Sequence, residues 1–103
     1  MPYQADRDAY ASVATGQSTP ARFITAVTPS DSTDLTLYAK ALRISVPDAT
    51  SNPTIRVTPV EAVSDSDTVT LPLPAGVTIE PLSVRRVWAT GTSAGLTIHA
   101  YVR

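Results

Sequence analysis

Cysteine is absent from this chain of 103 residues. Its absence excludes disulfide bonds, thiolate nucleophiles and cysteine-bound zinc. His99 is the single histidine and no G-x-S-x-G motif occurs, so nucleophilic hydrolysis by a serine–histidine–aspartate arrangement has little support. Glycine is scarce too, and the segment ATGTSAG at 89–95 is interpreted as a hairpin turn between two strands rather than a phosphate-binding loop. We therefore expect no catalytic residues, no enzyme activity and no cofactor.

Charge of either sign is sparse, and long apolar runs are missing. Eight Lys and Arg residues oppose nine Asp and Glu residues, for a formal net charge of −1. This balance provides no basic surface for nucleic acid. No apolar run reaches the roughly 20 residues that a membrane-spanning helix needs. We therefore expect neither nucleic-acid binding nor membrane insertion.

Prolines and alternating apolar residues dominate what is present. The expected strands cover residues 21–27, 35–46, 54–60, 68–74, 77–91 (interrupted at Pro81) and 96–102. The apolar phase changes within 35–46, which predicts a bulge or a break into two strands. Pro72 and Pro74 cannot donate to a ladder, so the 68–74 strand is expected at a sheet edge. Six to eight short strands predict an all-β fold, a small antiparallel β-sandwich or barrel-like domain over residues 21–103.

The first 20 residues have no sustained apolar period and are expected to form an extended N-terminal arm. Such a segment usually becomes ordered against a partner. Tyr3 and Tyr10 stand among small residues, a pattern that suits two aromatic anchors. We therefore predict that Tyr3 and Tyr10 lie at contacts with a partner chain.

The segment VTPSDSTDLTL at 27–37 raises the question of a metal site. Asp31 and Asp34 lack the alternating spacing, the glycine and the terminal glutamate of a calcium loop. A turn accounts for the same residues, because Pro29 restricts φ and aspartate side chains accept hydrogen bonds from nearby backbone N–H groups. We predict that Pro29, Asp31 and Asp34 are structural turn residues and that no metal is bound.

Arg85 and Arg86 form the remaining constellation, next to Trp88. Adjacent residues of a strand point to opposite faces, so the two arginines are not expected to form one patch. One is expected to brace its own sheet, and the other to reach a neighbouring chain, because Arg and Trp are enriched at protein interfaces. We therefore predict Arg85 and Arg86 as candidate interface residues.

A second interpretation uses the aromatic residues differently. Trp88, Tyr38 and Tyr101 would be sugar-stacking residues in a free carbohydrate-binding β-sandwich. Most aromatic residues of so small a domain belong to its core, which places this interpretation second.

Four segments carry a resemblance to a known family: PAR (20–22), VTPSDSTDL (27–35), YAKALRI (38–44) and SVRRVWATGT (83–92). In this order and spacing they resemble the spike base protein family of tailed-phage and gene-transfer-agent heads, from Pro20 to Arg103. The resemblance implies a structural virion protein, the base of a head spike, anchored on capsid vertices and carrying a host-binding fibre.

The same resemblance implies the partners and the location. The partners would be further copies of the chain in a ring, for which a pentamer is one candidate, the major capsid protein at the five-fold vertex, and the spike fibre protein. The location would be the capsid surface of a virion made in the bacterial cytoplasm.

Overall fold

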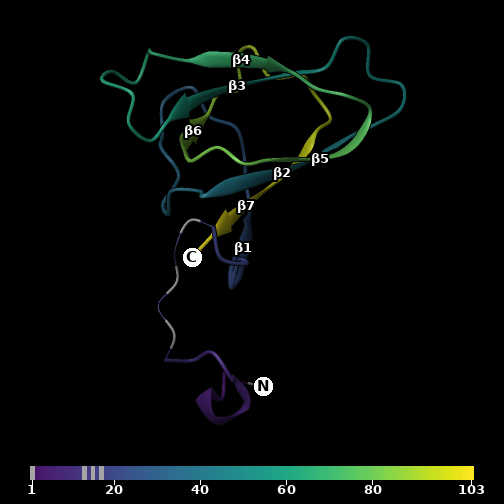
Figure 1. The fold of residues 1–103 in the computed structure, drawn as a ribbon. Coiled ribbons are helices and arrows are strands. Elements are labelled where there is room, and N and C mark those ends of the chain that lie inside the picture. The colour runs from purple at the N-terminus through teal and green to yellow at the C-terminus, as the bar shows by residue number, and fades with distance from the viewer. Residues whose placement is uncertain (1, 13, 15, 17) are drawn as a thin grey trace.

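The computed structural model describes residues 2–12, 14, 16 and 18–103. These residues form one 3₁₀ turn, η1 (Ala5–Arg7), and the strands β1 (Phe23–Ala26), β2 (Ala41–Val46), β3 (Thr54–Pro59), β4 (Val69–Pro72), β5 (Gly76–Glu80), β6 (Val84–Val87) and β7 (Thr97–Val102). The strands make two antiparallel sheets, in the orders β1-β7-β2-β5 and β4-β3-β6 (Figure 1). The predicted small antiparallel β-sandwich is confirmed, and β4 lies at an edge as its prolines indicate.

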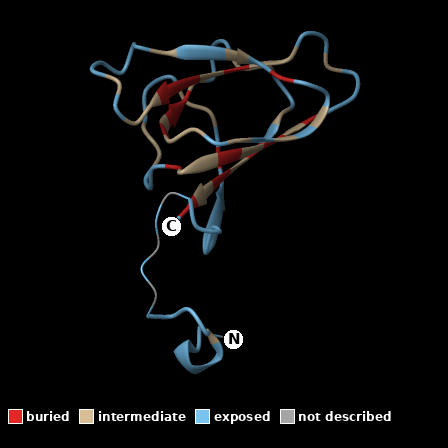
Figure 2. Cartoon of the chain, viewed as in Figure 1, coloured by how far each residue is buried: buried red, intermediate tan, exposed pale blue. Residues whose placement is uncertain are grey.

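The core lies between the two sheets. Its apolar side chains alternate with more exposed ones along the inner strands, as the buried segments in Figure 2 show. The buried apolar residues of these strands are Leu42, Ile44 and Val46 in β2, Ile55 and Val57 in β3, Val84 and Val87 in β6, and Ile98, Ala100 and Val102 in β7. Because a shift of one residue would turn each apolar set toward solvent, this alternation determines the register of the sheets.

The phase change within residues 35–46 is a break, one of the two predicted alternatives, although residues 35–40 do not form a regular strand. Strand β2 starts only at Ala41, and residues 28–39, here called the edge segment, run along the open edge of β6. Backbone N–H groups of Ser30, Leu35 and Ala39 donate to the carbonyls of Val87, Arg85 and Val84, at 2.9, 2.8 and 2.9 Å. The edge segment therefore satisfies backbone groups that β6 would otherwise expose.

The segment 89–95 differs from its sequence-based interpretation as a hairpin turn. It connects β6 in one sheet with β7 in the other, so it crosses between the layers. Gly91 in this crossing has a φ of +95°, and a Cβ there would lie 2.8 Å from Cδ of Arg56. The crossing thus requires glycine at this position, both for its backbone conformation and for its close approach to β3.

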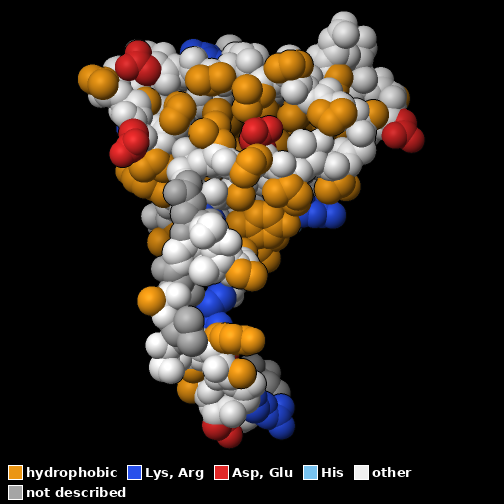
Figure 3. Space-filling view, in the orientation of Figure 1, with side chains coloured by type: hydrophobic (Ala, Val, Ile, Leu, Met, Phe, Trp, Pro, Cys, Tyr) orange, Lys and Arg blue, Asp and Glu red, His pale blue; other side chains and the backbone are white. Residues whose placement is uncertain are grey.

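The N-terminal arm lies outside both sheets and projects from the sandwich (Figures 1 and 3). Residues 1, 13, 15 and 17 of the predicted arm lie outside the described residues. Lys40 Nζ donates to the carbonyls of Thr19 (2.9 Å) and Gly16 (3.2 Å), and Arg22 pairs with the Asp8 carboxylate. None of the arm's described residues belongs to the core cluster. We therefore predict that the sandwich folds without the arm.

We expect a chain that lacks residues 2–19 to remain folded. The contacts it loses are exposed and polar, and such pairs contribute about 0–1 kcal/mol each. Its circular dichroism spectrum should be near native, and its melting temperature should fall by no more than about 4–8 °C. Loss of the cooperative unfolding transition would show instead that the arm is part of the folding unit.

Candidate functional site

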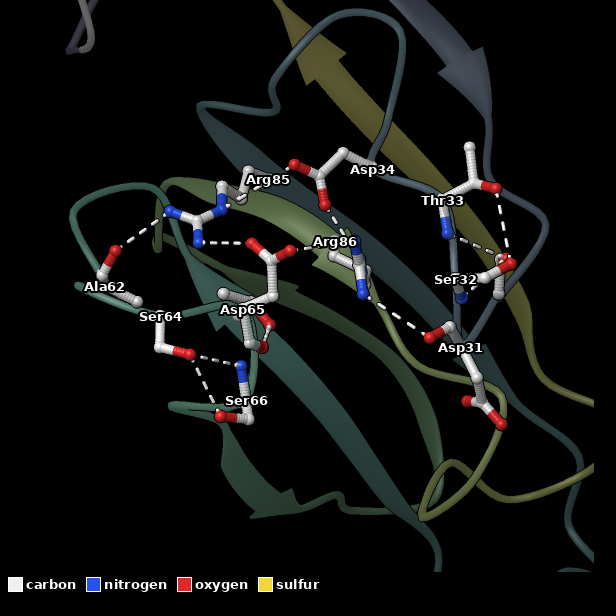
Figure 4. A network of polar contacts seen from close by, with 12 residues as sticks. Asp31, Ser32, Thr33, Asp34, Ala62, Ser64, Asp65, Ser66, Arg85 and Arg86 are labelled. Carbon is white, nitrogen blue, oxygen red and sulfur yellow. Dashed lines mark hydrogen bonds and ion pairs between the residues drawn. The ribbon is translucent and has the colours of Figure 1, made fainter.

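Two arginines and two aspartates form a closed cluster beside β6 (Figure 4). Asp34 belongs to the edge segment, Asp65 to the loop after β3, and Arg85 and Arg86 to β6. Arg86 Nε lies 2.7 Å from Asp34 Oδ1, and Arg85 Nη2 lies 2.7 Å from Asp65 Oδ1. The crossed pairs are longer, at 3.4 Å for Arg86 with Asp65 and 3.7 Å for Arg85 with Asp34. Each guanidinium thus contacts both carboxylates.

The expectation that strand alternation would separate the two arginines was wrong. Their side chains are only 13% and 8% exposed, and both are occupied within the chain. Arg85 Nη1 also donates to the carbonyls of Val60 (3.2 Å) and Ala62 (2.9 Å). The edge segment and the loop after β3 both bring carboxylates to β6, and long arginine side chains can bend toward a shared pair. Both guanidinium groups are thus occupied within the chain, and the contact of one of them with a neighbouring chain stays a prediction.

The predicted turn is present, but its aspartates bond elsewhere. Pro29 precedes the turn, and Ser30 Oγ accepts the backbone N–H groups of Ser32 (3.3 Å) and Thr33 (3.2 Å), as turn chemistry predicts. The Asp31 carboxylate instead accepts the backbone N–H of Thr90 at 2.8 Å and its hydroxyl at 2.6 Å. This contact spans 59 residues of the chain. The two aspartates therefore connect the edge segment to distant elements rather than to their own turn.

Hydrogen bonding also changes the acidity of Asp31. The Thr90 hydroxyl, followed by the Thr90 backbone N–H, lowers the pKa of the Asp31 carboxyl below its ordinary value of 3.8. Donors lower a carboxyl pKa because they stabilise the charged form.

Trp88 packs against arginine side chains. The guanidinium carbon of Arg56 lies 4.3 Å from its ring centroid, and that of Arg86 lies 5.2 Å away. The indole N–H donates to the hydroxyl of the fully buried Thr58 at 2.8 Å, and this hydroxyl donates to the carbonyl of Asp65 at 2.9 Å. These contacts occupy Trp88, one of the three aromatic residues on which the carbohydrate-binding interpretation rests.

The cluster has the chemistry of a structural brace. Its carboxylates are paired with guanidinium groups, and His99 lies on the outer face of the other sheet, opposite Arg43. Within the described residues, no group of three or more His, Asp or Glu side chains is placed to hold a metal ion. No helix in the same part of the chain is long and apolar enough to cross a membrane.

Tyr3 and Tyr10, the predicted anchors, lie on either side of Asp8. The Tyr3 hydroxyl donates to Asp8 Oδ2 at 2.7 Å, and the Tyr10 backbone N–H donates to Asp8 Oδ1 at 3.0 Å. Both tyrosines are largely exposed, at 69% and 65%. Residues 3–10, here called the aromatic knob, therefore present two aromatic side chains to solvent at the far end of the arm.

Sequence reasoning missed Asp8 and Asp65, which organise the knob and the cluster. Each stands in a polar segment where nothing local distinguishes it from a solvated aspartate. Predicting the role of Asp65 would have required knowing which loop lies beside β6. Predicting the role of Asp8 would have required knowing that Arg22, the basic residue after the arm, lies close to it.

Replacing Asp34 with alanine should destabilise the fold. The two guanidinium groups would lose a shared carboxylate, and hydrogen bonds to charged groups contribute about 1.5–3 kcal/mol. We expect a decrease of this size in the free energy of unfolding, measured by urea denaturation. Asp48→Ala is the matched control, because Asp48 is exposed and has no hydrogen bond or ion pair within the described residues; it should change stability by less than about 0.5 kcal/mol. Equal effects of both variants would contradict the bracing role.

The contribution of Asp31 should depend on pH. Because its folded-state pKa lies below the unfolded value, the charged form stabilises the fold above pH 3.8, and this contribution disappears as the pH falls through the folded pKa. Wild type should therefore be more stable than Asp31→Asn near neutral pH, and the two should converge in acid. Urea denaturation of both proteins across this range measures the difference. A difference that stays constant with pH would mean that the charge plays no part.

Comparison with known proteins adds one solved relative. No protein-family model and no curated protein matches the chain. A chain in the capsid of a native gene transfer agent (GTA) particle, computed with C5 symmetry, is 33% identical in sequence and superposes with a TM-score of 0.71. The match covers 91% of the present chain and 98% of the relative. Such identity over nearly the whole of both chains reaches beyond a shared fold, and the protein therefore belongs to the same family as this component of the gene transfer agent capsid.

Proposed function

We propose that the protein is a structural component of a phage or gene-transfer-agent particle, and that it forms the base of a head spike on the capsid vertices. The observation that carries this proposal is the 33% identity to a chain of the GTA capsid. The finer assignment to the spike base is supported by the ordered segments PAR, VTPSDSTDL, YAKALRI and SVRRVWATGT.

A structural role agrees with the chemistry of the described residues. The carboxylates of the cluster are neutralised by arginines, and Trp88 packs inside the same network. These groups connect β6 to the edge segment and to the loop after β3. The polar residues thus serve the rigidity of a small domain, which suits a particle component and involves no catalysis or cofactor.

The proposed partners follow from a position on a vertex. The related capsid structure was computed with C5 symmetry, and copies of a protein arranged around a five-fold axis would form a closed ring of identical contacts. The ring would meet the major capsid protein on one side and carry the spike fibre on the other. The protein would accordingly be located on the capsid surface.

The aromatic knob is the proposed site through which the protein binds to the particle. Aromatic residues are enriched at the centres of protein interfaces, and the exposed Tyr3 and Tyr10 belong to the N-terminal arm, which projects from the sandwich. Arg85 and Arg86 are paired inside the chain, and their interface role stays a prediction.

Particles produced without this chain should lack spikes at their vertices. Electron microscopy of such particles measures this directly, and normal vertices would contradict the proposed function. Supplying variants of the chain to these particles tests the spike-base role and the role of the aromatic knob separately. The full chain should restore the spikes, whereas a chain without residues 2–19, or one carrying Tyr3→Ala and Tyr10→Ala, should not bind to particles. Normal occupancy by either arm variant would show that the knob is not the attachment point.

A further inference from the structure

The two edges of the three-stranded sheet are protected against further pairing. The edge segment pairs with β6 through backbone hydrogen bonds and covers one edge. The other edge is β4, which contains Pro72 and is followed by Pro74. Proline cannot donate to a ladder, and natural proteins use it to prevent pairing between sheets.

The two edges of the four-stranded sheet have no such protection. Within the described residues, β1 and β5 each pair on one side only. Neither strand contains proline, lysine or arginine, and Glu80 at the end of β5 is their one charge. Large apolar side chains are instead exposed along them, with Ile24 46%, Val77 55% and Ile79 51% exposed. Figure 3 shows apolar side chains gathered in the region of β1 and β7. Such edges are templates for pairing with another strand.

The sheet order makes these two edges complementary to each other. Its four strands are antiparallel throughout, so β1 and β5 run in opposite directions. If a second copy of the chain approached in the same orientation, its β1 would lie antiparallel to β5 of the first. The alternation of strand directions would then continue across the contact.

We propose that copies of this chain associate head to tail, with β1 of one copy paired to β5 of the next. This inference rests on the proposed function, since it names the contact that would build the ring on the vertex. Head-to-tail contacts close into rings when the rotation permits. In a closed ring of this kind, both edges of every four-stranded sheet are paired. A two-fold pairing of β1 with β1 would instead leave the β5 edge of each sheet exposed.

One register matches the side chains of the two strands. Pairing within the sheet places Ile24, Ala26, Val77 and Ile79 on the outer face and Thr25 and Thr78 on the core side. Antiparallel pairing of Ile24 with Ile79 also sets Thr25 opposite Thr78 and Ala26 opposite Val77. Isoleucine is then opposite isoleucine, threonine is opposite threonine, and alanine is opposite valine. The two residues of each pair lie on the same face of the continued sheet.

Disulfide trapping of the full chain tests this contact, because the wild type has no cysteine. Neighbouring antiparallel strands place opposite Cα atoms about 4.5–5.5 Å apart, within the range of a disulfide. A mixture of Ile24→Cys and Ile79→Cys should form a cross-linked dimer under mild oxidation. The chain carrying both substitutions should give a ladder that ends in a closed ring. A mixture of Ile24→Cys and Thr78→Cys is the matched control, since Thr78 points to the other face, and its yield should be several-fold lower.

A charged substitution on the same edge provides a second measurement. Ile79→Lys should abolish self-association in sedimentation velocity, while Val63→Lys, at a loop residue that is 98% exposed, should preserve it. Equal cross-linking with Ile79→Cys and Thr78→Cys, or unchanged association of Ile79→Lys, would overturn the proposed pairing. If only the proposed pairing is wrong, the protein should still be found on the vertices of the particle. If the proposed function is wrong, the protein should be absent from those vertices.

Discussion

The cover over the open edge of β6 is the constraint on which the rest of the structure depends. A three-stranded sheet with two free edges would expose backbone donors and acceptors, and the edge segment satisfies those of β6. Its two aspartates keep it in place, Asp31 through Thr90 and Asp34 through both arginines of β6. Closing this edge brings the charged residues of three separate segments into one cluster.

The same cover determines where interactions with partners can occur. Arg85, Arg86 and Trp88 would be attractive interface residues on a bare strand, but the edge segment and the loop after β3 use them internally. Exposed apolar side chains remain on β1, on β5 and in the aromatic knob. A protein whose arginine–aspartate cluster is paired within the chain and whose free strand edges are apolar is suited to assembly. This distribution agrees with its relationship to a component of the GTA capsid.

The differences between expectation and structure have one physical origin. Turn chemistry considers partners within a few residues, and it accounts for the bonds that Ser30 Oγ accepts. Asp34 and Asp31 instead bond residues that lie 52 and 59 positions away. Strand alternation likewise separates Arg85 from Arg86 only as far as Cβ, and their long side chains converge because carboxylates approach from both flanks of β6.

The sequence by itself determined the all-β class, the position of most strands, an irregularity within residues 35–46 and the edge position of β4. Alternation and proline placement carry this information because they act within a single strand. Only the tertiary structure decided which sheet each strand joins, which loops lie beside β6, and which edges stay open. Those outcomes depend on the order of strands in the sheets, so they also decide the partners of Asp31, Asp34 and Asp65. Strand order arises from contacts between segments far apart in the chain, which no local pattern of residues encodes.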